Sequence, residues 1–307
     1  MNLDVPITNL DHRFPIMSVH DETVHQYGLE GVAKTSLIAL AARAWDAECL
    51  NPVLGDIRAA EIIQALPFDT TDLYMPVNDI QGVAIRSKQF DKWTAVFLAE
   101  HPDALILHLA CGLDGRADRV GWDGSGPSLW IDVDLPEVVE LRKQYITSST
   151  SGSAYQLIGA DVLKDDWLES LPRNRPTAVV MEGLLSYLKA EDSRDLIAKL
   201  TKHFEHGELY FECLSSLALR AGHQASSLDV VRKTGAALQS SMDDLYDLEK
   251  IGSGIKVHEV LRFVELPGVE KLSWTRRLQM YLLSWTPGLR DGSRLIRLFF
   301  GVQPSIA

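Results

Sequence analysis

Short apolar runs alternate with amphipathic stretches from about residue 101 onward, and this alternation restricts the fold more than any other feature of the chain. Strands that alternate with helices form a parallel sheet whose two faces are both covered. The sequence therefore predicts an α/β core. The five runs that have the length and composition of buried strands are 104–110, 128–134, 154–161, 177–183 and 208–214.

The first hundred residues are mainly helical in pattern. Residues 22–49, 56–65 and 86–99 are the three expected helices, and Phe90, Trp93 and Phe97 form an apolar stripe along the third. Residues 1 to about 20 have no periodicity, so we expect an arm that packs on the body or frays.

Two further apolar stretches follow the five runs, at 255–266 and 293–302, with an amphipathic helix around 276–284 between them. They bring the expected number of strands to seven. The resulting division is a helical N-terminal extension or lid at 1–100 and a core at 101–307, with a helical insertion at about 215–253.

Charge and cysteine usage exclude several classes of protein. The 307 residues include 42 acidic and 30 basic side chains, for a formal net charge of −12, which would repel a nucleic-acid backbone. Three cysteines without a CxxC motif favour a reducing compartment. There is no basic, apolar leader at the start and no apolar run of about 18 residues that could span a membrane. We therefore expect a cytoplasmic protein without a membrane partner.

Carboxylates follow three of the expected strands, at the edge where open parallel sheets bind ligands. The first strand leads into a glycine turn, 110–116, and Asp134 ends the second strand 22 residues after Gly112, a spacing typical of an acid that binds a ribose. Asp161 and Glu182 end the third and fourth strands. The third glycine of G-x-G-x-x-G is missing, which favours S-adenosylmethionine over a nicotinamide dinucleotide.

Structural alternatives exist for these side chains. Asp132 and Asp134 could cap the helix that begins at Pro136, and Asp161 could cap the segment after it. Arg86 could be a solvated residue of an amphipathic helix. Glu182 is harder to explain in this way, because a carboxylate at the end of an apolar strand is costly unless it is paired or wet.

The chain resembles the leucine carboxyl methyltransferase-like superfamily, and within it the polyketide O-methyltransferase branch typified by the tetracenomycin carboxyl methyltransferase. The resemblance spans roughly residues 20 to 301. It implies a class I S-adenosylmethionine-dependent methyltransferase fold, Rossmann-like, with a seven-stranded sheet. The motifs that carry it are LACGLDGR at 109–116, WIDVDLPEVVELR at 130–142, GADVLKDDW at 159–167 and MEGLLSYL at 181–188, together with 34–63, 85–98 and 231–236.

The resemblance also implies roles for individual residues. Arg86 would bind the methionine carboxylate of S-adenosyl-L-methionine with help from Lys34, and Gly112 would let the backbone lie against the amino-acid part. Asp134 would hold the ribose, with Asp161 on the adenine amine and Glu182 facing the ammonium group. The full expected cofactor set is Lys34, Arg86, Ala110, Gly112, Asp132, Asp134, Asp161, Val162 and Glu182.

The implied activity is O-methylation of a carboxyl or phenolic oxygen on an aromatic or polyketide-like small molecule. Tyr27 and Tyr187 are candidates for the acceptor pocket; we assign no catalytic base and expect no metal. The alternatives are methylation of a protein C-terminal carboxylate and a cofactor-binding protein that does not methylate, with a nicotinamide dehydrogenase as a more distant one. The acceptor and the oligomeric state stay open.

Overall fold

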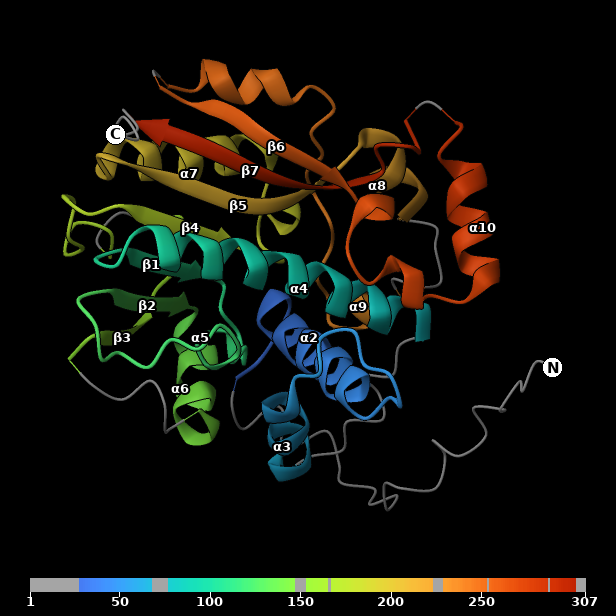
Figure 1. Ribbon diagram of the computed structural model, residues 1–307, viewed down its shortest axis with the longest axis horizontal. Helices are drawn as coiled ribbons and strands as arrows, with labels where there is room; N and C mark the ends of the chain where they lie inside the picture. The colour runs from blue at the N-terminus through green and yellow to red at the C-terminus, as the bar shows by residue number, and fades with distance from the viewer. Residues whose placement is uncertain are drawn as a thin grey trace.

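The computed structural model describes residues 28–67, 77–146, 153–164, 167–222, 229–252, 254–286 and 288–301. Its centre is a seven-stranded sheet with the order β3-β2-β1-β4-β5-β7-β6 (Figure 1). Neighbours among the first five strands pair in parallel, whereas β7 runs antiparallel to both β5 and β6. All seven predicted strands are confirmed: β1 Leu105–Leu109, β2 Leu129–Asp134, β3 Tyr155–Gly159, β4 Thr177–Met181, β5 His206–Leu214, β6 Lys256–Arg262 and β7 Ser293–Gly301.

Helices cover both faces of the sheet and extend beyond its edge. Three helices precede β1 and one lies between β6 and β7, as the periodicity predicts, but α2 begins at Val32 and α4 at Val77, where the pattern indicated residues 22 and 86. Short helical pieces occupy the predicted insertion after β5. The longer helices are α2 Val32–Ala47, α3 Ile57–Ala65, α4 Val77–Glu100, α6 Pro136–Tyr145, α7 Ala190–His203 and α10 Trp274–Leu283; the shorter ones are α5 Arg116–Arg119, η3 Leu185–Tyr187, α8 Ser216–Gly222, α9 Asp229–Lys233, η5 Leu245–Lys250, η6 Phe263–Glu265 and η7 Val269–Lys271.

The central strands are apolar on both faces because helices cover both. Every residue of β1 and β4 is buried. On one face, the predicted stripe of α4, Phe90, Trp93 and Phe97, packs into a cluster with Ile106 and Trp130. Leu196, Ile197 and Leu200 of α7 cover the other face. Because α4 packs on the sheet, it contributes to the core itself; a lid role for residues 1–100 stays a prediction.

The helices α2 and α3 lie at the edge where the parallel strands end, as Figure 1 shows by the direction of the β1, β2 and β4 arrows. Leu37, Leu40 and Ala41 of α2 are buried in a cluster that includes Val138 and Leu141 of α6. The N-terminal helices therefore form one wall of the strand-end edge. None of the helices in the described ranges is long and apolar enough to cross a bilayer.

Gly207 gives a test of the β4–β5 pairing. It is paired with Thr177, and a Cβ atom built on it would lie 1.9 Å from the Thr177 carbonyl oxygen. Gly207→Ala should therefore disrupt this register and lower the free energy of unfolding by more than about 3 kcal/mol, measured by urea denaturation. Gly121→Ala is the control: Gly121 has φ +73° and no atom near its Cβ position, so only the strain of about 1 kcal/mol is expected. Equal losses in the two variants would contradict a steric requirement at Gly207.

Candidate functional site

The turn after β1 has an unusual backbone. Ala110 has φ +51°, the only positive φ at a non-glycine position among the described residues, and Gly112 has the same value. A Cβ atom on Gly112 would lie 3.1 Å from Cβ of Ser36 on α2, so a methyl group would fit only if Ser36 moved by a few tenths of an ångström. The turn is thus held close to α2, and Gly112 meets both a conformational and a steric requirement.

Asp134 ties this turn to the end of β2. Its two carboxylate oxygens accept the N–H groups of Gly112 at 2.6 Å and Leu135 at 2.7 Å. The N-cap residue of α6 is Leu135 and no side chain caps that helix, so the capping alternative for Asp134 is wrong. Burial raises the pKa of Asp134, and the two backbone hydrogen bonds oppose that rise.

Asp132 is fully buried and committed to other side chains. Its carboxylate accepts hydrogen bonds from Trp130 Nε1 at 2.7 Å and Tyr155 OH at 2.8 Å, and it pairs with Arg142. Burial alone would raise the pKa of Asp132, but Arg142 and His108 bring it down to about 2. The expectation that Asp132 contacts a cofactor does not fit these contacts, and we correct it to a structural role.

Arg142 explains what Asp132 does for the site. The Arg142 guanidinium donates to the carbonyl oxygens of Gly112 at 2.9 Å and Asp114 at 2.8 Å. Asp132 therefore fixes the position of Arg142, and the Arg142 guanidinium in turn fixes the glycine turn. Sequence reasoning missed Arg142, although its place as the last residue of the 130–142 motif was a usable signal.

Arg86 and Glu182 are brought together although 96 residues separate them. Arg86 Nε donates to Glu182 Oε1 at 3.0 Å, Ser87 Oγ donates to the same oxygen at 2.7 Å, and Arg116 Nη2 donates to Oε2. Burial would raise the pKa of Glu182, but Arg86 and Arg116 lower it to about 2. The solvated alternative for Arg86 is wrong, because only 25% of its side chain is exposed and it is paired.

A chain of buried ion pairs continues behind Glu182. Arg119 lies 2.6 Å from both Asp56 and Asp114, and Arg116 Nε lies 3.3 Å from Asp91. Arg43 Nε on α2 lies 3.3 Å from Asp56. This network, which links α2, α3, α4, the glycine turn and β4, was not predicted from the sequence, because it assembles residues from distant segments.

The other expected site residues are placed as follows. Asp161 accepts the N–H of Leu163 at 3.1 Å, and Val162 is buried in the hydrophobic core. Lys34 is half-buried on α2, without an ion pair inside the described ranges. Tyr187 is partly buried against the α2 cluster, and burial raises its pKa. Tyr27 lies outside the described residues.

Glu212, near the end of β5, was also missed. Its Oε1 accepts the N–H of Gly183 at 2.7 Å and lies 3.5 Å from Arg86 Nη1. The available signal was the same as for Glu182, an acid near the end of an apolar strand.

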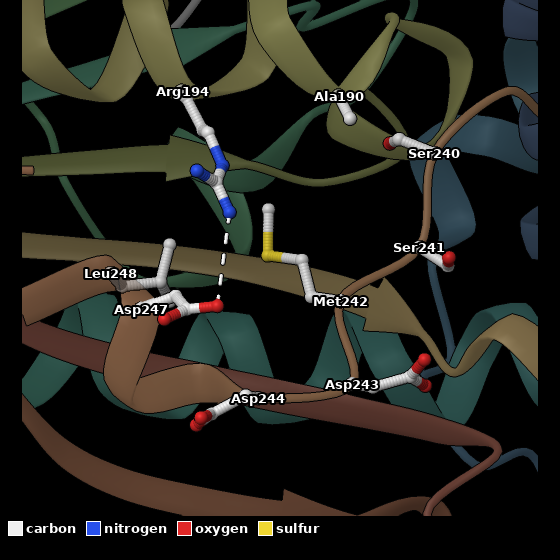
Figure 2. A pocket seen from close by; sticks show the side chains of 9 residues that line it. All are labelled: Ala190, Arg194, Ser240, Ser241, Met242, Asp243, Asp244, Asp247 and Leu248. Carbon is white, nitrogen blue, oxygen red and sulfur yellow. Dashed lines mark ion pairs between the residues drawn. The ribbon is translucent and has the colours of Figure 1, made fainter.

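A pocket of about 260 Å³ lies between α7 and the segment 240–248 (Figure 2). Arg194 and Asp247 face each other across it at 3.9 Å. None of the expected cofactor residues lines this pocket. Within the described part of the chain, no group of three or more His, Cys, Asp or Glu side chains is arranged to hold a metal ion.

The backbone strain at Ala110 can be tested by replacing this residue with glycine. Ala110→Gly removes a Cβ from a left-handed conformation, so the free energy of unfolding should rise by about 0.5–1 kcal/mol in urea denaturation. Ala104→Gly, at a buried position without a positive φ, should lower it by about 1 kcal/mol. A loss of stability in both variants would show that the φ of Ala110 is not strained.

The Asp132–Arg142 pair predicts a pH dependence of stability. Because the pKa of Asp132 falls from 3.8 to about 2 on folding, its contribution is complete above pH 3.8 and is lost as the pH falls toward 2. Asp132→Asn should lower the free energy of unfolding by about 3 kcal/mol near neutral pH, because Arg142 stays buried without its partner. The difference from the wild type should narrow at about pH 3 in urea titrations. If Asp132→Asn and the wild type differed in free energy of unfolding by the same amount at neutral pH and at pH 3, the lowered pKa of Asp132 would be contradicted.

Comparison with known proteins agrees with the strand-end motifs. The sequence profile of the family described as leucine carboxyl methyltransferase matches residues 38–201. The tetracenomycin polyketide synthesis O-methyltransferase TcmP of Streptomyces glaucescens is 35% identical over 272 residues, which cover 89% of this chain and 98% of that protein. The S-adenosyl-L-methionine-dependent methyltransferase dpfgK of Gibberella zeae is 34% identical, over 75% of this chain and 82% of its own.

Solved structures support the fold. A DUF574 family protein of Streptomyces avermitilis superposes with a TM-score of 0.53 at 13% identity, covering 85% of this chain and 97% of that one. A candidate methyltransferase of Thermobifida fusca superposes with a TM-score of 0.50 at 15% identity, covering 85% of this chain and 94% of that one. With the observed strand order, they confirm the expected class I methyltransferase fold. Because the profile covers more than half of the chain and TcmP aligns over most of it, this chain belongs to the leucine carboxyl methyltransferase family.

Proposed function

We propose that the protein is an S-adenosyl-L-methionine-dependent O-methyltransferase that acts on a carboxyl or phenolic oxygen of an aromatic, polyketide-like small molecule. The observation that carries the proposal is the cluster at the strand ends, where Asp134 holds the Gly112 turn and Arg116 of the same turn joins it to the Arg86–Glu182 pair. Open α/β sheets bind their ligands at this edge. Family membership and the names of the two relatives, one of them a polyketide O-methyltransferase, support it.

The residues fit the methyl donor. Gly112 has no side chain, so the turn can lie against an amino-acid group. Arg86 carries a partly exposed guanidinium, paired with Glu182 at the end of β4, that can bind a carboxylate. Asp134 and Asp161 end neighbouring strands and are assigned to the ribose and the adenine amine. Lys34, on α2, is assigned to assist Arg86.

The reaction requires placement more than proton transfer. S-adenosyl-L-methionine, when bound, supplies a methyl group on a positively charged sulfur, and the products are the methylated oxygen and S-adenosyl-L-homocysteine. The chain has to hold the acceptor oxygen about 3–3.5 Å from that carbon and exclude water. A carboxylate acceptor is already ionised at neutral pH and needs no base, whereas a phenol with a pKa near 10 would benefit from one.

The acceptor side is assigned to the elements that surround the strand ends. Tyr187 packs against the cluster that contains α2. The helices α8 and α9 of the insertion lie on the side of the sheet toward which the parallel strands point (Figure 1). Helical additions of this kind vary among enzymes of one fold and set specificity. The net charge of −12 favours a small-molecule acceptor over a nucleic acid. Three free cysteines, two of them buried, suit a cytoplasmic location.

The proposal predicts methyl transfer to a small acceptor. The protein is incubated with isotope-labelled S-adenosyl-L-methionine and a panel of aromatic acids and phenols, and products are read by mass spectrometry. We expect an acceptor that gains one labelled methyl group. Asp134→Asn should lower the affinity for S-adenosyl-L-homocysteine at least about tenfold in calorimetry, because the charged acceptor for the ribose hydroxyls is lost.

The matched control is Asp123→Asn, an exposed aspartate in a turn whose replacement should leave this affinity unchanged. Methylation of a peptide C-terminal carboxylate, with none of the small acids or phenols modified, would replace the proposed substrate class. Donor binding without any methylated product would point to a binding protein. Unchanged affinity in Asp134→Asn would remove Asp134 from the site.

A further inference from the structure

Helix α10 presents its apolar side chains to solvent. None of its ten residues is buried, and the least exposed row along it is Arg276, Met280 and Ser284. The helix lies at the margin of the molecule, away from the sheet (Figure 1). Six large apolar side chains of the helix and its C-terminal end are exposed, and we name them the α10 face: Trp274 (69% exposed), Leu278 (48%), Tyr281 (57%), Leu282 (54%), Leu283 (41%) and Trp285 (70%).

An uncovered face of this kind marks an interaction site. Contiguous exposed apolar patches are rare on monomeric proteins and occur where another surface binds. A helix as short as α10 is also only marginally stable in water without packing contacts. We therefore looked for the partner whose surface the α10 face fits.

Four side chains of the α10 face have the spacing of a helix–helix seam. Trp274, Leu278, Tyr281 and Trp285 follow one another at intervals of four, three and four residues. This is the alternation of d and a positions with which one helix packs against another. The rings of Tyr281 and Trp285 contact each other edge to face, with centroids 5.5 Å apart. The spacing therefore fits a second helix with an apolar face.

Charge helps to identify that helix. Residues 271–290 include no Asp or Glu, although the whole chain has a net charge of −12. That net charge opposes binding to an anionic lipid surface. A second copy of the chain brings the same carboxylate-free helix, so the contact would remove no carboxylate from water, in keeping with the depletion of charge at interface cores. The basic residues of the run lie outside the seam and are Lys271, Arg276, Arg277 and Arg290.

We propose that the α10 face is the interface of a homodimer, in which the α10 helices of two copies pack antiparallel across a twofold axis. Trp274 then lies opposite the partner subunit's Trp285, and Leu278 lies opposite the partner subunit's Tyr281. The centre of the contact is apolar, with aromatic pairs at both ends. The antiparallel arrangement also opposes the two helix dipoles.

The position of Arg277 favours the antiparallel arrangement over a parallel one. In the antiparallel register Arg277 lies opposite the partner subunit's Leu282. A parallel pair would set the two copies of Arg277 side by side, and like charges placed together in an interface are destabilising. The same seam therefore fits itself in one orientation only.

The area of the α10 face is sufficient for a dimer. Its exposed parts amount to roughly 600 Å² in each copy, since a single aromatic side chain can bury about 150–250 Å². Two copies would bury about 1,200 Å², at the lower end of the range for specific, stable interfaces. Trp and Tyr are also the residue types that contribute most binding energy at interfaces.

The first test is the oligomeric state, measured by sedimentation velocity over a concentration series from the micromolar range upward. We expect the wild type to sediment with twice the mass of a single chain. Leu278→Glu and Tyr281→Glu each place a charge at the centre of the seam, so each should raise the dissociation constant of the dimer at least about a hundredfold. Both side chains are exposed in the single chain, so the circular dichroism spectrum should be unchanged.

The matched controls are exposed apolar residues outside the α10 face. Leu50→Glu corresponds to Leu278→Glu, and Tyr246→Glu corresponds to Tyr281→Glu, because Leu50 is fully exposed and Tyr246 is 70% exposed on η5. Both control variants add the same charge to the surface. They should sediment as dimers, like the wild type.

The second test reads the orientation and does not depend on the glutamate variants. In a Cys49→Ser background, which removes the exposed native thiol, Leu278→Cys and Tyr281→Cys proteins are mixed and oxidised. Antiparallel packing should give a disulfide between the two different proteins and little disulfide in either protein alone. Parallel packing should give the reverse.

Four results would overturn the inference. A wild type that is monomeric at every concentration would exclude the homodimer, and its binding to vesicles of anionic lipid would then assign the α10 face to a membrane surface. A dimer that persists in both Leu278→Glu and Tyr281→Glu would place the interface elsewhere. Loss of the dimer in the control variants as well would show a general effect of added charge. Disulfides formed within each cysteine variant alone would exclude the antiparallel arrangement.

Discussion

The pairing of buried arginines with carboxylates at the strand ends is the interaction on which the rest of the site depends. Charges removed from water stabilise a structure only when geometry and hydrogen bonds compensate for desolvation, and removal of a single partner is strongly destabilising. Arg116 has no exposed surface and contacts Asp91, Asp114 and Glu182. These contacts join α4, the glycine turn and β4 into one unit. The position of the Gly112 turn is therefore inseparable from that of the N-terminal helices.

This dependence explains why the N-terminal helices belong to the functional site. Arg43 on α2 and Asp56 at the start of α3 complete the network that surrounds Glu182. Asp56 also caps α3 by accepting the Ala59 N–H at 3.1 Å. A helical segment that only shielded the sheet from solvent would not need to contribute buried charges such as Arg43 and Asp56 to the strand ends. The helices before β1 therefore build the proposed cofactor side of the site as well as its wall.

The sequence predicts the strands, the edge proposed to bind ligand and several residues there, because these follow from local patterns. Apolar runs mark β1 to β5, and acids at strand ends mark Asp134 and Glu182. Local patterns do not show which acid is already satisfied. Asp132 and Asp134 are two residues apart, yet one is enclosed by Trp130, Tyr155 and Arg142 and the other meets the turn. Arg142 and Glu212 went unnoticed for the same reason, since their partners come from distant segments. The positive φ of Ala110 has no sequence signal at all.

Burial alone does not separate a structural carboxylate from a binding one, because all four acids at the ends of β2, β4 and β5 are buried. The number of donors that each acid already has is more informative. Asp132 is saturated by side chains, and Glu182 is nearly so. Asp134 is held by two backbone N–H groups, which leave lone pairs on both oxygens. Glu212 has an entire oxygen without a donor. The acceptor capacity that remains on Asp134 is what a saturated structural carboxylate such as Asp132 lacks.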